Sequence, residues 1–187
     1  MGLDMYLYAN SKTLAEKLAP YTGFGMGDFT AKNGIVAYWR KANAVHKWFV
    51  DNVQGGNDDC GLYRVSVDDL ITLKKTCEEV LEYSRKNGLE ESKTAFYNLF
   101  EDGKVVQKPC LIIKDSSKAE ELLPTQTGFF FGETEYTEFY LQDLEHTISV
   151  IETILNNITN EGMDWDFEYC VKGEPDWIVE FTYHSSW

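Results

Sequence analysis

The chain has 187 residues, of which 43% are hydrophobic and 14% aromatic, and its formal net charge is −14. A chain of this length fits one domain with a core large enough to fold without disulfides or a structural metal, and its aromatic content excludes intrinsic disorder. The negative charge repels phosphate backbones and so argues against direct nucleic-acid binding.

Two short strands are predicted near the start of the chain. Residues 3–8 alternate weakly between apolar and polar side chains, and residues 35–39 are β-branched and aromatic. Between them, residues 21–34 contain glycines at short intervals, which predicts a loop.

Two helices follow from the spacing of apolar residues. The first is predicted over residues 41–53, where one face is apolar in steps of three and four: Ala42, Val45, Phe49 and Val53. Ser66 and Asp69 resemble a capping box, in which two side chains satisfy free backbone donors at a helix start. The second helix is therefore predicted to begin at Ser66 and to reach Lys86, with Asn87-Gly88 as its left-handed stop.

The second half of the chain predicts one long helix between strands. Residues 105–114 are typical of a strand or hairpin arm. Apolar residues step by three and four without a miss over residues 138–158: Leu141, Leu144, Ile148, Ile151, Leu155 and Ile158. Two closing strands are predicted over residues 165–171 and 177–183, joined by a turn through residues 173–176.

The combined pattern predicts a single-domain α+β fold over residues 1–187, in which an antiparallel or mixed sheet is packed by about three helices. Residues 90–102 have no clear pattern and are interpreted as a surface excursion. No secretory signal or apolar run of about 20 residues is found, and the four cysteines contain no Cys-x-x-Cys pair. These features predict a cytoplasmic protein with reduced thiols.

One stretch departs from the acidic character of the chain. Residues 32–47 contain four bases and no acid, and Trp39 and Trp48 lie within or beside them. Arginine binds phosphate or carboxylate through two parallel bonds, and indole faces stack on flat groups. Trp39, Arg40, Lys41 and Trp48 therefore predict a pocket for a small anionic, nucleotide-like ligand. The alternative is that the bases line the solvent-facing side of a helix.

Three further residues are assigned to this predicted pocket. His46 lies on the apolar helical face and is either a hydrogen-bonded core residue or a ligand-facing group. Thr125 precedes a string of glycines and phenylalanines whose backbone amides could hold an anion, with a buried turn as the alternative. Trp187 is expected to be buried against residues 129–131 or beside Trp48, because chain ends fray unless something holds them.

No metal site and no cofactor are predicted, and no catalytic residue is assigned. The three histidines have no histidine partner at metal-ligand spacing. The Asp58-Asp59-Cys60-Gly61 loop leaves two alternatives open: a hard-cation site, and a hydrolase or transferase in which His46 activates Cys60. The absence of a catalytic motif favours a binding protein over an enzyme.

A different class of function would use the acidic surface itself. A protein whose acids lie along one face imitates nucleic acid and occupies the basic groove of a host protein, whereas scattered acids only maintain solubility. The candidate acids for such a face are Asp68, Asp69, Glu78, Glu79, Glu82 and those within residues 133–143.

Several motifs resemble a family of small acidic proteins from bacteriophages and prophages. They are Met1-Gly2-Leu3-Asp4-Met5-Tyr6-Leu7, Tyr38-Trp39-Arg40-Lys41-Ala42-Asn43, His46-Lys47-Trp48-Phe49, Asp58-Asp59-Cys60-Gly61, Leu123-Pro124-Thr125, Gly128-Phe129-Phe130-Phe131-Gly132 and Ser185-Ser186-Trp187. The resemblance spans most of the chain. It implies a protein of the bacterial host cytoplasm that acts by binding a small molecule or a host protein, and it implies no mechanism.

Overall fold

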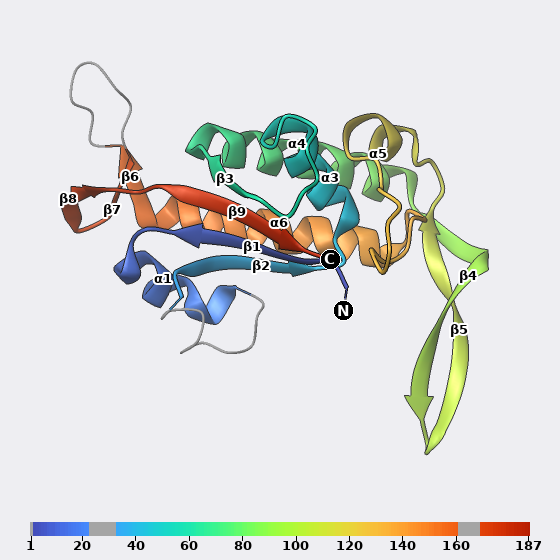
Figure 1. Ribbon diagram of the computed structural model, residues 1–187. Coiled ribbons are helices and arrows are strands. Elements are labelled where there is room, and N and C mark those ends of the chain that lie inside the picture. The colour runs from blue at the N-terminus through green and yellow to red at the C-terminus, as the bar shows by residue number, and fades with distance from the viewer. Residues whose placement is uncertain (1, 23–32, 161–168) are drawn as a thin grey trace.

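Four antiparallel strands form the main sheet of the computed structural model, which describes residues 2–22, 33–160 and 169–187 (Figure 1). The order across the sheet is β2-β1-β9-β3. The bounds are Asp4–Ala9 for β1, Ile35–Arg40 for β2, Leu62–Val65 for β3 and Phe181–Ser186 for β9. The two strands predicted near the start of the chain are therefore confirmed as β1 and β2.

Alternation along β1 decides which face of the sheet becomes the core. Met5 and Leu7 are fully buried, whereas Tyr6 and Tyr8 between them are half-buried on the other face. Met5 pairs with Trp39 of β2, so the large residues of neighbouring strands share the buried face. This is the period of two that a half-buried strand requires.

Helices cover the buried face of the sheet, except for the short helix at Ser117–Leu122, which packs against another helix (Figure 1). Their bounds are Lys12–Leu18 for α1, Asn43–Asn52 for α3, Val67–Asn87 for α4, Ser117–Leu122 for α5 and Glu138–Asn157 for α6, with a short 3-10 turn at Ala19–Tyr21. The Trp39 indole N–H donates to Thr147 Oγ1 on α6 at 2.9 Å. Phe49 of α3 stacks on Tyr183 of β9 with ring centroids 4.0 Å apart. These contacts join both helices to the sheet.

The ends of the longest helix follow from its flanking residues. Ser66 Oγ accepts from the Asp69 N–H at 3.0 Å, and the Asp69 carboxylate accepts from the Ser66 N–H at 2.8 Å, so the predicted capping box is confirmed. Gly88 ends α4 with φ of 81°, which glycine adopts without strain. Helices α3, α4 and α6 correspond to the three that apolar spacing predicts.

A two-stranded hairpin projects from this body and corrects the sequence interpretation of residues 90–102 (Figure 1). Residues 90–101 belong to β4, Leu89–Glu101, which pairs with β5, Lys104–Ile113. Asp102 and Gly103 join the strands with φ of 49° and 76°. Two positive φ angles are what a type I′ hairpin turn needs, and Asp-Gly supplies them.

A small sheet of β6, Ile158–Asn160, β7, Tyr169–Val171, and β8, Glu174–Ile178, closes the fold. The predicted turn through residues 173–176 is wrong in extent, because Gly173 turns with φ of 89° and β8 begins at the next residue. Most of the predicted loop 21–34 and the first part of the predicted strand 165–171 lie outside the described residues.

The architecture is the single-domain α+β fold that the sequence predicts, with antiparallel sheets and three long helices against the largest of them. Within the described ranges, none of the helices has the length and apolar character needed to cross a membrane.

Candidate ligand pocket

A pocket of about 270 Å³ opens where β2 ends and where α3 and α6 begin. Its walls come from the end of β2, the first turn of α3, the segment between α5 and α6, and the first two turns of α6. Three of the residues predicted to bind ligand, Arg40, Lys41 and Thr125, line it together. The structure thus joins two sequence motifs that lie more than 80 residues apart.

The two bases at the pocket have few competing partners. The Arg40 Nε lies 3.9 Å from the Asp4 carboxylate, and the arginine side chain is 62% exposed. Lys41 forms no ion pair or side-chain hydrogen bond with any residue that the structure describes. Its φ of 61° is unusual for a residue with a side chain, and such strain is concentrated at functional sites. Both charges remain available to an anion.

The N-terminus of α3 adds backbone donors to the same wall. Ala42 precedes the helix and has no side-chain oxygen to cap it. Within the described part of the chain, the N–H groups of Ala44 and Val45 find no hydrogen-bond acceptor, and both residues line the pocket. Free N–H groups at a helix start carry partial positive charge and bind anions.

The opposite wall is acidic. Glu133, Glu135 and Asp143 line it, and Glu135 accepts from the Thr94 hydroxyl at 3.2 Å. Burial raises the pKa of Asp143 to about 7, so its carboxyl is partly protonated near neutral pH. A protonated carboxyl donates a hydrogen bond, whereas the ionised form accepts from amino groups. The pocket therefore has one basic wall and one wall whose carboxylates can accept hydrogen bonds from a ligand.

The aromatic component of the pocket differs from the prediction. Trp39 and Trp48 are 2% and 7% exposed and belong to the core, so neither indole lines the pocket as predicted. Both rings are large and apolar, so burial in the core stabilises them, and there the Trp39 N–H also has a hydrogen-bond partner. Phe139 at the start of α6 lines the pocket instead and is 39% exposed.

Asn43 fixes the segment that forms the outer wall. Its Nδ2 donates to the Glu133 carbonyl at 2.7 Å and lies 3.3 Å from the Phe131 carbonyl, while its Oδ1 accepts from the Gln126 N–H at 3.1 Å. Asn43 is itself buried, so these bonds are shielded from water. One side chain therefore holds two points of the same loop against α3.

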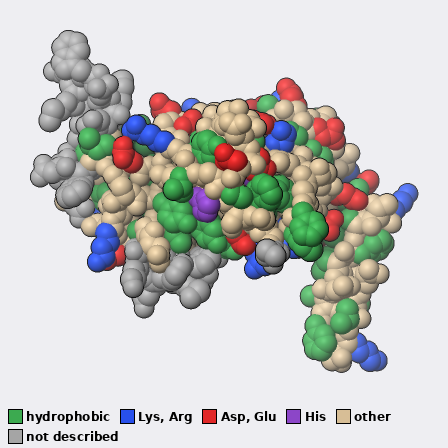
Figure 2. All heavy atoms as spheres, in the orientation of Figure 1, with side chains coloured by type: hydrophobic (Ala, Val, Ile, Leu, Met, Phe, Trp, Pro, Cys, Tyr) green, Lys and Arg blue, Asp and Glu red, His purple; other side chains and the backbone are tan. Residues whose placement is uncertain are grey.

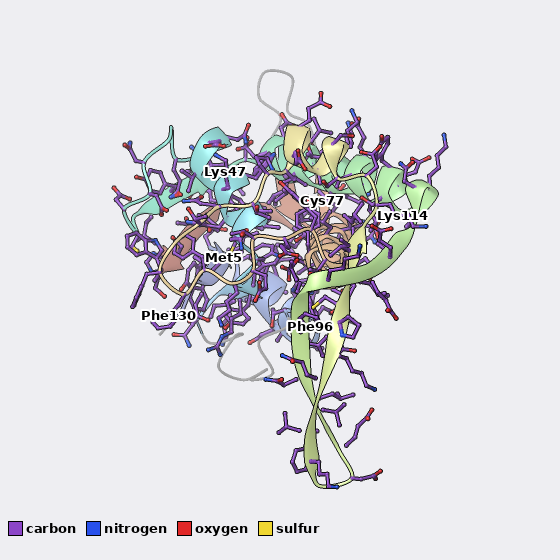
Figure 3. The ribbon with its side chains drawn as sticks, turned by 90° about the vertical axis from the view of Figure 1, so that its right-hand side faces the viewer. Met5, Lys47, Cys77, Phe96, Lys114 and Phe130 are labelled. Atoms are coloured by element: carbon purple, nitrogen blue, oxygen red, sulfur yellow. The ribbon has the colours of Figure 1, made fainter. Side chains whose placement is uncertain are left out.

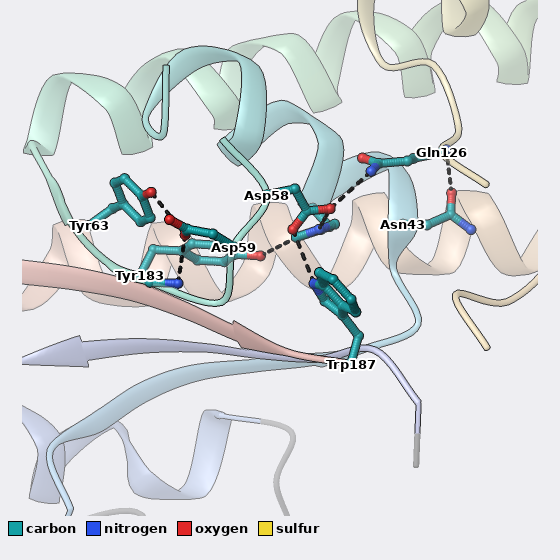
Figure 4. Close-up of polar contacts among 9 residues, drawn as sticks. Asn43, Asp58, Asp59, Tyr63, Gln126, Tyr183 and Trp187 are labelled. Carbon is teal, nitrogen blue, oxygen red and sulfur yellow. Dashed lines mark hydrogen bonds and ion pairs between the residues drawn. The ribbon is translucent and has the colours of Figure 1, made fainter. Parts of the chain in front are cut away.

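Asp58 extends this attachment to the C-terminus (Figure 4). Its carboxylate accepts from Gln126 Nε2 and from Trp187 Nε1, each at 3.1 Å, and lies 3.1 Å from His46 Nε2 without the alignment of a hydrogen bond. Tyr183 Oη lies 2.8 Å from His46 Nδ1. The network joins α3, β9 and the loop around Gln126.

His46 is a core residue of this network. It is fully buried, and burial lowers its pKa despite the nearby Asp58 carboxylate, which leaves a neutral ring. The Asp58 carboxylate beside Nε2 can only accept, so the neutral ring carries its hydrogen on Nε2 and its Nδ1 accepts from the Tyr183 hydroxyl, which burial keeps protonated by raising its pKa. His46 supports the pocket wall and does not line the pocket.

The alternatives based on residues 58–61 have no support from this geometry. Both ring nitrogens of His46 face other groups, so His46 is not directed at Cys60 as its base. Asp59 accepts from the Gly61 N–H and the Tyr63 hydroxyl, both at 2.9 Å. Among the described residues, no three His, Cys, Asp or Glu side chains come together as metal ligands.

Trp187 contacts the segment expected of it but is not buried as expected. Its ring meets Phe131 edge-on at 5.9 Å, yet the residue is 48% exposed and does not line the pocket. The indole N–H needs a polar partner, and the bond to Asp58 holds the ring at the surface.

A second hollow of about 710 Å³ lies beside the start of α4 and lacks these features. Its arginine, Arg64, is 3.2 Å from Glu180, and the Ser66–Asp69 box occupies the Asp69 N–H and places a carboxylate at the helix start. The pocket at α3 is therefore the better candidate for an anion.

Sequence reasoning missed Phe139, Asp143 and the role of Asn43. Asp143 carried a usable signal, because it lies three residues after Tyr140 and four before Thr147 on the inward stripe of α6. A carboxylate at such a position is rarely buried without a function or a partner. Comparison of the chain with protein-family models, with curated proteins and with solved structures finds no match.

Proposed function

We propose that the protein is a non-catalytic binder of a small anionic, nucleotide-like ligand, which occupies the pocket at the start of α3. One observation carries the proposal: Arg40, Lys41 and the free N–H groups of α3 line the same pocket. Each is a recognised phosphate-binding element, and together they supply charge and direction.

The two walls suggest how such a ligand would lie. Its phosphate or carboxylate would face Arg40, Lys41 and the α3 N-terminus. Its flat part would contact Phe139, and amino groups on that part would donate to Asp143 or Glu133. A nucleotide has all three features, whereas inorganic phosphate has only the first. Stoichiometric binding needs no nucleophile or general base, and the proposal assigns none.

The proposed setting is the cytoplasm of a bacterial host, in keeping with the phage-like motifs. All four cysteines are free thiols, and three of them, Cys77, Cys110 and Cys170, are buried. Free thiols of this kind suit a reducing compartment.

The nucleic-acid mimic is the weaker alternative, because bases neutralise several of the candidate acids. Glu78 lies 2.6 Å from the Lys74 ammonium and Glu79 lies 3.0 Å from that of Lys118. Asp69 is used by the helix cap. Figure 2 shows acidic and basic side chains interspersed along the upper edge of the molecule, and no continuous acidic patch on the side that faces the viewer.

Thermal unfolding with added ligands tests the proposal. A panel would include phosphate, pyrophosphate and the nucleoside mono-, di- and triphosphates. A ligand at about 100 times its Kd adds about 2.7 kcal/mol of stability, which raises the midpoint of a domain this size by roughly 5–10 °C. Arg40→Ala with Lys41→Ala should abolish the shift.

The matched control removes one arginine and one lysine that lie outside the pocket. Arg64 and Lys47 lie outside the pocket, in pairs with Glu180 and Asp51. Arg64→Ala with Lys47→Ala should leave the shift intact. The proposal fails if no member of the panel stabilises the wild-type chain, or if both double variants lose the shift equally.

A further inference from the structure

The hairpin of β4 and β5 exposes large apolar side chains far from the pocket. We call residues 96–109 of this hairpin the arm. Phe100 and Val105 at its end are 73% and 67% exposed, and Phe96, Leu99 and Val106 are also exposed. Figure 3 shows this part of the hairpin extending from the body with no other element beside it. An isolated two-stranded hairpin is only marginally stable in water, so a surface that covers these side chains would stabilise the arm.

The base of the arm is fixed to the body. Ser92 is buried, and its Oγ accepts from the N–H groups of Thr94 and Ala95 at 3.1 and 2.9 Å. These bonds shape the bulge at which the regular pairing of β4 with β5 is interrupted. The Tyr97 ring meets Phe139 edge-on at 5.6 Å. The arm is thus presented in one direction and does not hang from a loose linker.

The two free edges of the arm differ in protection. β5 carries Lys104, Lys108 and Pro109, which are residues that block pairing at a sheet edge. β4 carries neither a charge nor a proline from Ala95 to Phe100, and its residues favour strands. Among the described strands, β4 pairs only with β5. The unprotected edge is therefore that of β4.

The sequence of that edge is symmetric in chemistry about Asn98. It reads Phe96-Tyr97-Asn98-Leu99-Phe100, so an antiparallel copy centred on Asn98 places each phenylalanine opposite the other one and each tyrosine opposite a leucine. A two-fold contact needs such a self-complementary surface. We propose that β4 pairs edge to edge with β4 of a second copy of this chain, forming a four-stranded sheet across two protomers.

The register of the hairpin supports this pairing. Phe96 lies opposite Pro109, and Phe100 lies opposite Val105, on one face of the hairpin. In the joined sheet, one row across the four strands consists of Pro109 and Phe96 of one copy followed by Phe100 and Val105 of the second copy. Each such row is apolar across all four strands, and aromatic pairs between strands are among the more stabilising ones. The apolar side chains that an isolated arm leaves in water would pack on their counterparts.

Charge favours the arm as the point of contact between like chains. The chain has a net charge of −14, but within the arm Lys104 and Lys108 balance Glu101 and Asp102. In the proposed register the two bodies lie at opposite ends of the paired strands, roughly 20 Å apart at about 3.3 Å per residue. That separation is about twice the Debye length in physiological salt. Two acidic bodies can thus associate through their arms with weak repulsion.

Sedimentation velocity of the full chain over a range of concentrations tests the proposal. The wild-type chain should convert from one protomer to two as concentration rises. Phe96→Glu with Phe100→Glu should remain a single protomer, and so should Phe96→Lys with Phe100→Lys. An equimolar mixture of these two variants should restore the two-protomer species, since each glutamate then faces a lysine.

The control variant is Phe129→Glu with Phe130→Glu, which alters two exposed rings outside the hairpin and should still pair. Circular dichroism would check that every variant is folded. Three results would overturn the proposal: a wild-type chain that stays a single protomer up to millimolar concentration, arm variants that still pair alone, or a mixture that does not pair. None of these results would bear on the proposed ligand binding, because binding to the pocket is measured in a separate experiment.

Discussion

Asp143→Asn tests the electrostatics of the pocket most directly. Burial raises the pKa of the Asp143 carboxyl from 3.8 to about 7, and no strong partner compensates among the described residues. The native carboxyl therefore holds its proton more tightly than the unfolded one. The stability linked to that proton is complete below pH 3.8 and is lost as the pH rises through about 7.

The size of the effect follows from this difference. About three pKa units correspond to about 4 kcal/mol, which is an upper limit because the site relaxes and is partly wet. About half of the loss falls between pH 5.5 and pH 8.5, so we expect the wild-type chain to lose about 1–2 kcal/mol over that window. Asparagine has a similar shape and no titration, so Asp143→Asn should not lose this contribution.

Urea unfolding at several pH values measures the difference. The window lies above the sequence pI of about 4.6, where the chain keeps its negative charge. Glu133→Gln is the control, since Glu133 lines the same pocket but is exposed. Parallel loss of stability in the wild-type chain and in Asp143→Asn would refute a raised pKa at Asp143. If the pocket binds an anion, Asp143→Asn should also make its affinity less dependent on pH.

Three further substitutions probe the supports of the pocket and of the fold. Asn43→Ala removes the bonds to Gln126 and Glu133 and should cost about 2–3 kcal/mol, with faster proteolysis of the loop between them in a limited digest. Tyr183→Phe leaves His46 Nδ1 without its donor and should cost about 1–2 kcal/mol in urea unfolding. Ser66→Ala removes the cap of α4 and should cost about 1 kcal/mol in the same assay, whereas Ser66→Thr should restore it.

The sequence predicts those parts of the fold that are determined by residues close to one another in the chain. Helices α4 and α6 are long, with apolar residues at regular steps, and Ser66 and Gly88 mark the ends of α4. Of the hairpin, the sequence predicts β5, as the strand or hairpin arm over residues 105–114, but not β4, because alternation over residues 90–102 is weak although Asp102 and Gly103 are a typical type I′ pair. Helix α1 was missed because seven residues give too short a period.

The candidate pocket could be predicted only on its basic wall. Arg40 and Lys41 stand out because they interrupt an acidic chain within one short stretch. Asp143 and Phe139 reach the same pocket from about 100 residues further along the chain, and only the packing of α6 against the sheet brings them there. The sequence predicts the Trp39 indole at the pocket because of its stacking face, but burial of a large apolar ring in the core outweighs that use.

Trp187 tests whether strand pairing alone or also a side-chain hydrogen bond holds the C-terminus in place. Trp187 is 48% exposed, so burial of the ring contributes less than a buried indole would, and its N–H bond to Asp58 becomes the main interaction. Trp187→Phe keeps a ring against Phe131 and removes that bond. It should cost about 1 kcal/mol and lower the thermal midpoint by about 2–4 °C.

Deletion of residues 185–187 should cost more, because Ser185 and Ser186 also pair with β1 in the main sheet. A midpoint unchanged by Trp187→Phe but lowered by the deletion would show that strand pairing alone holds the C-terminus. The indole bond to Asp58 would then contribute nothing measurable, and the link drawn between the chain end and the wall of the pocket would be wrong.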